Sequence, residues 1–340
     1  MTAYAPPLEG RDPEKFTLLD FNERTLPVGK VVEDALVAYI RSGRLQMYPS
    51  YSDVVQRIAG YVGVPTEQVM ITNGSDQGID LIFRSACSPG DEVIIPGPSF
   101  AMYGQCAKIE DATVISPSYT REGGYPKAEV LAAINEKTRL IVVSNPNNPC
   151  GTLVSPGVIR EIAVAAPHAV ILVDECYFEY SKTTVVDFVA ELTNVLVTRT
   201  FSKTWGMPSL RLGYIVAAAE NIRALINVRG PYDVNQMAIV AIKAALTDID
   251  NVNAYIDEVM LVSKVQFESY LDTKNIEYWP SSANYVWVFF ENAKELELAL
   301  RAAGILVRAK ADANGRLGLR VTLGTEAQTR ALFVVLDQHL

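Results

Sequence analysis

Short apolar runs alternate with longer amphipathic segments through the first two thirds of the chain. Seven runs are rich in Val, Ile and Leu, and they cover residues 68–72, 92–96, 113–116, 140–144, 170–174, 194–198 and 212–216. Runs that are apolar at nearly every position are typical of strands buried on both faces. Helical spacing lies between them, as over residues 75–87 and 156–165. The pattern predicts an α/β fold whose large domain holds a mainly parallel seven-stranded sheet covered by helices.

The pattern changes after about residue 236. A long helical stretch to about residue 273 is followed by shorter elements of both kinds. The predicted strands include Tyr278 and residues 284–290, 305–308 and 317–322, and the predicted helices cover residues 294–303 and 326–339. A chain of 340 residues exceeds the usual size of one hydrophobic core. We therefore expect an arm over residues 1–25 that joins the small domain, a large domain over 26–250, and a linking helix with a small α+β domain over 251–340.

Charge and hydropathy exclude several classes of partner. The chain has 30 basic and 39 acidic residues, a net charge of −9, and no basic cluster that would bind nucleic acid. No stretch approaches the ~20 apolar residues that span a bilayer. The first seven residues lack the basic and apolar regions of a signal peptide, and the four cysteines have no CxxC spacing. The scattered cysteines and the absence of a signal peptide predict a cytoplasmic protein. With only two histidines and no ligand cluster, the sequence predicts no metal site.

Candidate functional residues follow the ends of the predicted strands. Asp174 ends an apolar run, and Lys203 stands in a Ser-Lys pair shortly after the next one. Because the carboxyl ends of parallel strands meet at one edge of a sheet, we expect these residues to form one site. A lysine that can form a Schiff base, an acid at a strand end and an Asn-Pro turn are what an enzyme needs to hold pyridoxal 5′-phosphate (PLP). A solvated surface lysine and a loop-capping aspartate are the alternatives.

Further residues fit the other parts of such a cofactor. Ser75 and Asp76 begin a predicted helix whose N-terminus could bind a phosphate group, with Ser202 and Arg211 in support, although either could be a simple N-cap. Tyr177 could donate a hydrogen bond to the ring oxygen, and Phe100 could stack on the ring. Both could instead be core aromatics.

Two arginines near the C-terminus are candidates for binding a substrate anion. Arg320 alternates with apolar residues in a predicted strand, so that it needs an anionic partner. Arg308 is the second candidate. The partner of Arg320 is either a structural carboxylate or the carboxylate or phosphate of a substrate.

Together these residues resemble the fold type I PLP-dependent aminotransferases, most closely the histidinol-phosphate aminotransferase branch. The resemblance runs from about Phe21 to the C-terminus. It implies that Lys203 carries the cofactor, that Arg211 binds its phosphate, and that Asn148 and Tyr177 bind the ring oxygen. It further implies a homodimer with shared active sites, in which Tyr48 of the Tyr-Pro pair reaches the neighbouring subunit's phosphate.

The same resemblance implies substrate contacts at Arg320, Arg308, Asn148 and Asn22. The sequence departs from the family pattern at two motifs. The Asn-Glu-Asn-Pro motif reads Asn-Glu-Arg-Thr from Asn22 onward, and the Asn-Pro-Thr-Gly turn carries Cys150 in place of Thr. No aromatic residue of the arm is identified as closing over the substrate. These changes affect the substrate side of the site rather than the cofactor side.

The expected reaction moves an amino group from a small-molecule amino donor to a 2-oxo acid such as 2-oxoglutarate. Lys203 would act as the general base and acid, while Asp174 keeps the ring nitrogen protonated. Histidinol phosphate in histidine biosynthesis is the best candidate donor. An aromatic amino acid aminotransferase and a PLP-dependent decarboxylase of the threonine-phosphate decarboxylase type are the alternatives.

Overall fold

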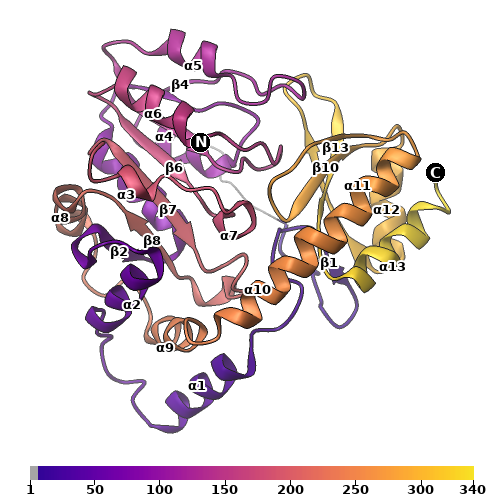
Figure 1. Cartoon of the computed structure of the whole chain (residues 1–340), viewed down its shortest axis with the longest axis horizontal. Coiled ribbons are helices and arrows are strands. Elements are labelled where there is room, and N and C mark those ends of the chain that lie inside the picture. The colour runs from indigo at the N-terminus through magenta and orange to yellow at the C-terminus, as the bar shows by residue number, and fades with distance from the viewer. Residues whose placement is uncertain (1–6) are drawn as a thin grey trace.

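In the computed structural model, which describes residues 7–340, a seven-stranded sheet forms the centre of the larger part of the molecule (Figure 1). Across the sheet the strands follow the order β2 (Val69–Thr72), β8 (Gly213–Val216), β7 (Val195–Thr200), β6 (Val170–Asp174), β5 (Thr138–Ser144), β3 (Glu92–Ile94) and β4 (Thr113–Ile115). All run parallel except β8, which is antiparallel to both of its neighbours. The mainly parallel α/β fold that the sequence predicts is therefore confirmed.

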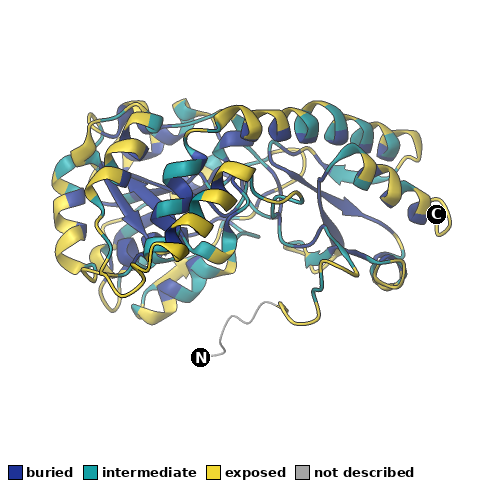
Figure 2. Ribbon diagram, turned by 90° about the horizontal axis from the view of Figure 1, so that it is seen from below, coloured by how far each residue is buried: buried dark blue, intermediate teal, exposed yellow. Residues whose placement is uncertain are grey.

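Both faces of this sheet are covered. The helices of this part of the chain are α1 (Lys30–Arg41), α2 (Ser52–Val62), α3 (Gly74–Ala86), α4 (Ala101–Ile109), α5 (Lys127–Ala133), α6 (Pro156–Ala165), α7 (Phe178–Ser181), α8 (Ala219–Val228) and α9 (Gln236–Ala245). Along β5, Ile141 and Val143 pack in one apolar cluster while Leu140 and Val142 pack in another. Figure 2 shows the buried strands lying between helices whose outer faces are exposed. Burial on both faces explains why these strands read as continuous apolar runs.

A smaller antiparallel sheet lies at the other end of the molecule. Its order is β12 (Arg308–Ala311), β13 (Leu317–Thr322), β10 (Tyr285–Phe289) and β9 (Glu277–Trp279). Beside it lie α11 (Lys264–Thr273), α12 (Ala293–Ala302) and α13 (Glu326–Leu336). A continuous helical run of α10 (Ile249–Asp257), the π-helical η4 (Glu258–Ser263) and α11 leads to it from the large sheet (Figure 1). The helical stretch expected over residues 236–273 is thus interrupted after α9.

The strand predicted over residues 305–308 is wrong in its extent, because the structure divides it between two sheets. β11 (Ile305–Leu306) pairs in parallel with β1 (Thr17–Leu18), whereas β12 begins at Arg308 and pairs with β13. Val307, buried between them, separates the two strands. The chain before residue 25 is thereby joined to the C-terminal part. The three-part division at residues 25 and 250 stays a prediction, and residues 1–6 of the expected arm lie outside the described residues.

Three further features concern the described part of the chain. None of its helices has both the length and the apolar character that crossing a membrane requires. Cys87, Cys106, Cys150 and Cys176 are all free thiols. Among residues 7–340 no three His, Cys, Asp or Glu side chains are grouped so as to hold a metal ion.

Candidate active site

A cavity of about 610 Å³ opens at the carboxyl ends of the parallel strands. Nine of the predicted site residues line it: Ser75, Asp76, Phe100, Asn148, Asp174, Tyr177, Ser202, Lys203 and Arg211. They come from seven separate stretches of the chain. The predicted convergence at one edge of the sheet is therefore seen in the structure.

Lys203 lies at the centre of this group, in the loop that follows β7. Its Nζ donates a hydrogen bond to the backbone oxygen of Phe21, at 2.9 Å. Burial, and then the positive charge of Arg320, lower the pKa of the Lys203 ammonium below that of a free lysine. The neutral amine, which can act as nucleophile and base, is therefore populated at lower pH than in a surface lysine.

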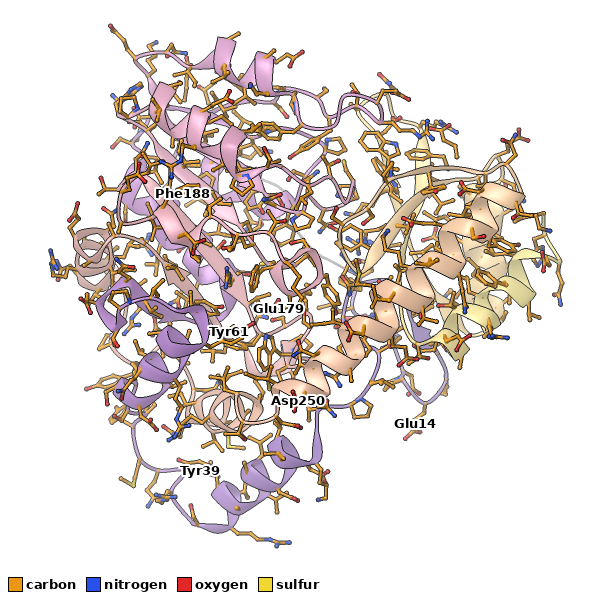
Figure 3. The ribbon with its side chains drawn as sticks, viewed as in Figure 1. Glu14, Tyr39, Tyr61, Glu179, Phe188 and Asp250 are labelled. Carbon is orange, nitrogen blue, oxygen red and sulfur yellow. The ribbon has the colours of Figure 1, made fainter. Side chains whose placement is uncertain are left out.

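The loop after Lys203 is held by a buried carboxylate. Trp205 donates its indole N–H to Glu179 Oε1 at 2.9 Å, and Thr204 donates its hydroxyl to Oε2 at 3.2 Å. Tyr61 donates to the same carboxylate from α2, at 3.4 Å. Figure 3 labels Tyr61 and Glu179, which lie close together below the sheet. These contacts fix the loop that carries Lys203.

Asp174 lies at the end of β6, where only 5% of its surface is exposed. Tyr103 donates its hydroxyl to Asp174 Oδ2 at 2.5 Å, and the backbone N–H of Cys176 donates to Oδ1 at 3.2 Å. Burial nevertheless raises the pKa of the Asp174 carboxyl above its usual value. The protein thus provides a buried acid whose ionised form would be stabilised by a cation placed in the cavity.

The N-terminus of α3 forms one wall of the cavity. The N-cap residue is Asn73 and the helix begins at Gly74, so Ser75 and Asp76 lie inside its first turn, and the alternative that either is the N-cap is excluded. Arg211 Nη2 donates to Asp76 Oδ2 at 2.8 Å across this terminus. Gly74 has φ 73°, a conformation that favours glycine, and the absence of a Cβ leaves room for the Arg211 guanidinium, whose Nη2 would lie 2.4 Å from it. Free helix N–H groups beside an arginine form a site for an anion such as phosphate.

Arg320 is placed between the two sheets. It is 5% exposed, and its Nη1 donates to Asn148 Oδ1 at 2.6 Å. Its Nη2 donates to the backbone oxygen of Asp20. Asn22, with φ 57°, donates its amide to the Tyr177 hydroxyl at 2.9 Å. Arg320 and Asn22 are thus one hydrogen bond away from residues that line the cavity.

Two predicted residues lie farther from the cavity. Arg308 stacks over the ring of Phe21, with 5.3 Å between guanidinium carbon and ring centroid. Tyr48 is 77% exposed and stacks on Tyr232, with ring centroids 4.3 Å apart. The side chain of Tyr48 does not line the cavity of its own chain.

Sequence reasoning missed three residues that take part in this geometry. Tyr103 bonds the buried acid, and its position one helical turn after Phe100 is the signal that could have indicated it. Phe21 is an arm aromatic that lines the cavity. Cys176 donates its thiol to the Ser75 hydroxyl, at 3.3 Å between sulfur and oxygen. The sequence around Cys176 gave no indication of this contact.

The residues around the cavity fit PLP. The buried Asp174 carboxyl suits a protonated pyridine nitrogen, and the anion site at α3 suits the phosphate. Lys203 lies in the same cavity and provides the amine that the aldehyde requires.

Comparison with known proteins agrees with this geometry. The model of the family described as "Aminotransferase class I and II" matches residues 14–336. The chain belongs to this family. It is 31% identical to a histidinol-phosphate aminotransferase of Limosilactobacillus fermentum, over 94% of this chain and 90% of that protein. It is also 31% identical to one of Geotalea daltonii, over 99% and 96% of the two chains.

Solved structures of similar fold include aminotransferases and a decarboxylase. Histidinol-phosphate aminotransferase from Sinorhizobium meliloti in complex with PLP gives a TM-score of 0.83 at 20% identity, covering 96% of this chain and 92% of that one. L-threonine-O-3-phosphate decarboxylase from Porphyromonas gingivalis gives 0.76 at 21% identity, covering 95% and 99%. The fold by itself therefore accommodates both reactions. The family match makes this chain a PLP-dependent aminotransferase.

Proposed function

We propose that this protein is a cytoplasmic, homodimeric histidinol-phosphate aminotransferase, which passes the amino group of histidinol phosphate to a 2-oxo acid such as 2-oxoglutarate. The observation that carries the proposal is Arg320, which is buried and joined to Asn148 at the cavity. A planar guanidinium in this place suits the phosphate of the donor in one half-reaction and the carboxylate of the oxo acid in the other. The names of the relatives point to the same donor.

Lys203 is the residue to which we assign the proton transfer. When bound, PLP supplies the electron sink that stabilises negative charge at the substrate's Cα. Lys203 Nζ would remove the Cα proton, since burial and Arg320 lower its pKa and keep the amine available as a base. The Glu179 contacts would keep this amine in reach by fixing the loop behind it.

The remaining lining residues would bind and orient the cofactor. Asp174 would pair with its ring nitrogen and Phe100 would stack on the ring. Tyr177 and Asn148 would bind the ring oxygen, with Asn22 holding the Tyr177 hydroxyl. The phosphate would be bound by a group at the start of α3 and after β7 that comprises Ser75, Asp76, Ser202 and Arg211.

A substrate screen tests the proposed function. We expect purified enzyme with PLP and 2-oxoglutarate to turn over histidinol phosphate with a kcat/KM at least about tenfold above that for Phe, Tyr, Trp, Leu or Asp, because discrimination by a paired charge is worth ~1.4 kcal/mol or more. A preference for Phe or Tyr would favour an aromatic aminotransferase. Release of carbon dioxide from threonine phosphate, without formation of an amino acid from the oxo acid, would favour the decarboxylase.

The surface around Tyr48 supports a homodimer. Tyr48, Tyr232, Leu45 and Met47 are all exposed apolar or aromatic side chains in the described chain. Such a group is unusual on a monomer and typical of an interface. We propose that it meets a second copy of the chain and that Tyr48 there reaches the neighbour's cofactor phosphate.

Hybrid dimers test whether the sites are shared. We mix Tyr48→Phe chains with Lys203→Ala chains after partial denaturation, so that each hybrid holds one site with neither lesion. If dimers form at random, activity should recover to about a quarter of the wild-type value, above the mean of the two parents. The control mixes wild type with a chain carrying both substitutions, which creates no intact site in the hybrid. A fully active monomer in sedimentation would contradict the proposal.

A further inference from the structure

Three basic side chains stand on one face of the small sheet. Arg308 on β12 lies directly opposite Arg320 on β13 in the antiparallel register. Lys310 follows two residues after Arg308, and because side chains alternate along a strand it lies on the same face. Ala309, between them, packs into the apolar cluster on the opposite face together with residues of α12. The strand geometry therefore gathers three cations on the face turned away from α12.

This cationic face borders the active-site cavity. Arg320 bonds Asn148, and Arg308 stacks over Phe21. Both of these partners line the cavity. Arg308 and Arg320 thus lie one contact away from the cavity, and Lys310 follows on the same face of β12.

Two of the cations on this face, Arg308 and Lys310, are not paired with a carboxylate in the described chain. Within residues 7–340, neither Arg308 nor Lys310 has a carboxylate at ion-pair distance, and the nearby Asp20 and Glu23 are both paired with Arg11. Burial, then Arg320 and Arg308, lower the pKa of Lys310 to about 8. Keeping an ammonium half-buried beside two guanidinium groups costs desolvation and repulsion, which an anion bound there would offset.

We propose that Lys310 is a specificity-determining residue, which supplies the third cation for a phosphate monoester dianion and so favours phosphate over carboxylate at the substrate's anionic end. The inference rests on the proposed function and deepens it. A carboxylate has two oxygens and one charge, which a guanidinium fork satisfies. A phosphate monoester has three terminal oxygens and, above its second pKa of about 6, close to two charges. Lys310 matches the additional oxygen and charge.

The test compares two donors on the holoenzyme of the same variants. Lys310→Gln removes the charge, Lys310→Arg keeps it, and Lys294→Gln removes an exposed charge from α12 as the matched control. For histidinol phosphate, kcat/KM should fall at least about tenfold in Lys310→Gln, the size of one charge-assisted hydrogen bond, and recover largely in Lys310→Arg. For glutamate, kcat/KM should change less than about twofold, because the arginines are retained.

The pH profile distinguishes a binding role from a merely structural one. Lys310 is charged below a pH of about 8 and loses its charge above it. The charged groups facing it are Arg308 and Arg320, while Glu297 of α12 accepts a bond from the Ala309 N–H on the other side. The ratio of kcat/KM for histidinol phosphate to that for glutamate should fall from pH 7 to pH 9 in wild type and stay flat in Lys310→Gln.

Failure of this inference can be told apart from failure of the proposed function. If the wild type does not use histidinol phosphate, the proposed function is wrong, and titration calorimetry of the holoenzyme with inorganic phosphate tests Lys310 alone. Phosphate should then bind at least about tenfold more weakly to Lys310→Gln than to wild type or Lys294→Gln. Equal losses for both donors, or no loss in kinetics and in phosphate binding, would overturn the role of Lys310.

Discussion

Lys203→Ala is expected to lose transamination by at least about 10⁴-fold, because the same amine attaches the cofactor and moves the proton. The wild-type protein should be yellow. Reduction with sodium borohydride should bleach its visible band and leave the cofactor's mass on the peptide that contains Lys203. The Lys203→Ala variant is expected to fold, because the substitution removes one hydrogen bond, to the backbone oxygen of Phe21, and no part of the packed core.

A matched control is Lys243→Ala, which removes a partly exposed lysine outside the cavity that pairs with Asp53. It should keep both the colour and the activity of wild type. A wild-type protein that gains no visible absorbance with added PLP would refute the assignment, as would a borohydride adduct on a different lysine.

Asp174→Asn should retain PLP but lower kcat by roughly 30- to several-thousand-fold. An amide cannot keep the ring nitrogen protonated, and a buried, hydrogen-bonded charge pair is worth about 2–5 kcal/mol. Tyr103→Phe, which removes only the hydroxyl bonded to Asp174 Oδ2, should have a smaller effect of about tenfold. Steady-state kinetics measure kcat in both variants, and the visible spectrum shows whether each retains PLP. Near-wild-type turnover by Asp174→Asn would show that Asp174 has another role.

In the apoprotein, Asp174→Asn should raise the thermal stability, although the same substitution lowers the activity of the holoenzyme. Burial raises the pKa of Asp174 in the folded chain, so ionisation of this carboxyl opposes folding once the pH rises above about 4, the value in an unfolded chain. Asparagine has no charge to bury. The thermal midpoint of the apoprotein at neutral pH should therefore rise in Asp174→Asn, and this gain should vanish at pH 3.

The large sheet could be predicted from sequence because burial on both faces leaves an unambiguous pattern. In β5 every residue from Leu140 to Val143 is apolar, and each packs on one face or the other. The break at Val307 could not be predicted in this way. Residues 305–307 form one continuous apolar run, and the end of the first strand at Leu306 depends on pairing with Thr17–Leu18, almost 300 residues earlier.

The meeting of Asp174 and Lys203 in one cavity could be predicted from sequence, because it depends on where the strands end. Their supporting contacts could not. The acceptor for Lys203 is a backbone oxygen 182 positions away, and any residue could have supplied it. Tyr103 lies 71 positions from Asp174, on a helix whose rotation only the packed fold determines. Long-range placement of this kind carries no local sequence signal.

Three consecutive residues before α1 couple cofactor binding to the order of the N-terminal segment. Asp20 accepts from Arg320, Phe21 accepts from Lys203, and Asn22 donates to Tyr177. Attachment of PLP leaves Lys203 with at most one of its three N–H donors, so the cofactor competes with Phe21 for that nitrogen. Cofactor loading and ordering of this segment are then thermodynamically linked, and the linkage is reciprocal. Binding of the cofactor is therefore expected to change the order of the segment formed by residues 20–22, which also contacts Arg320 and Tyr177.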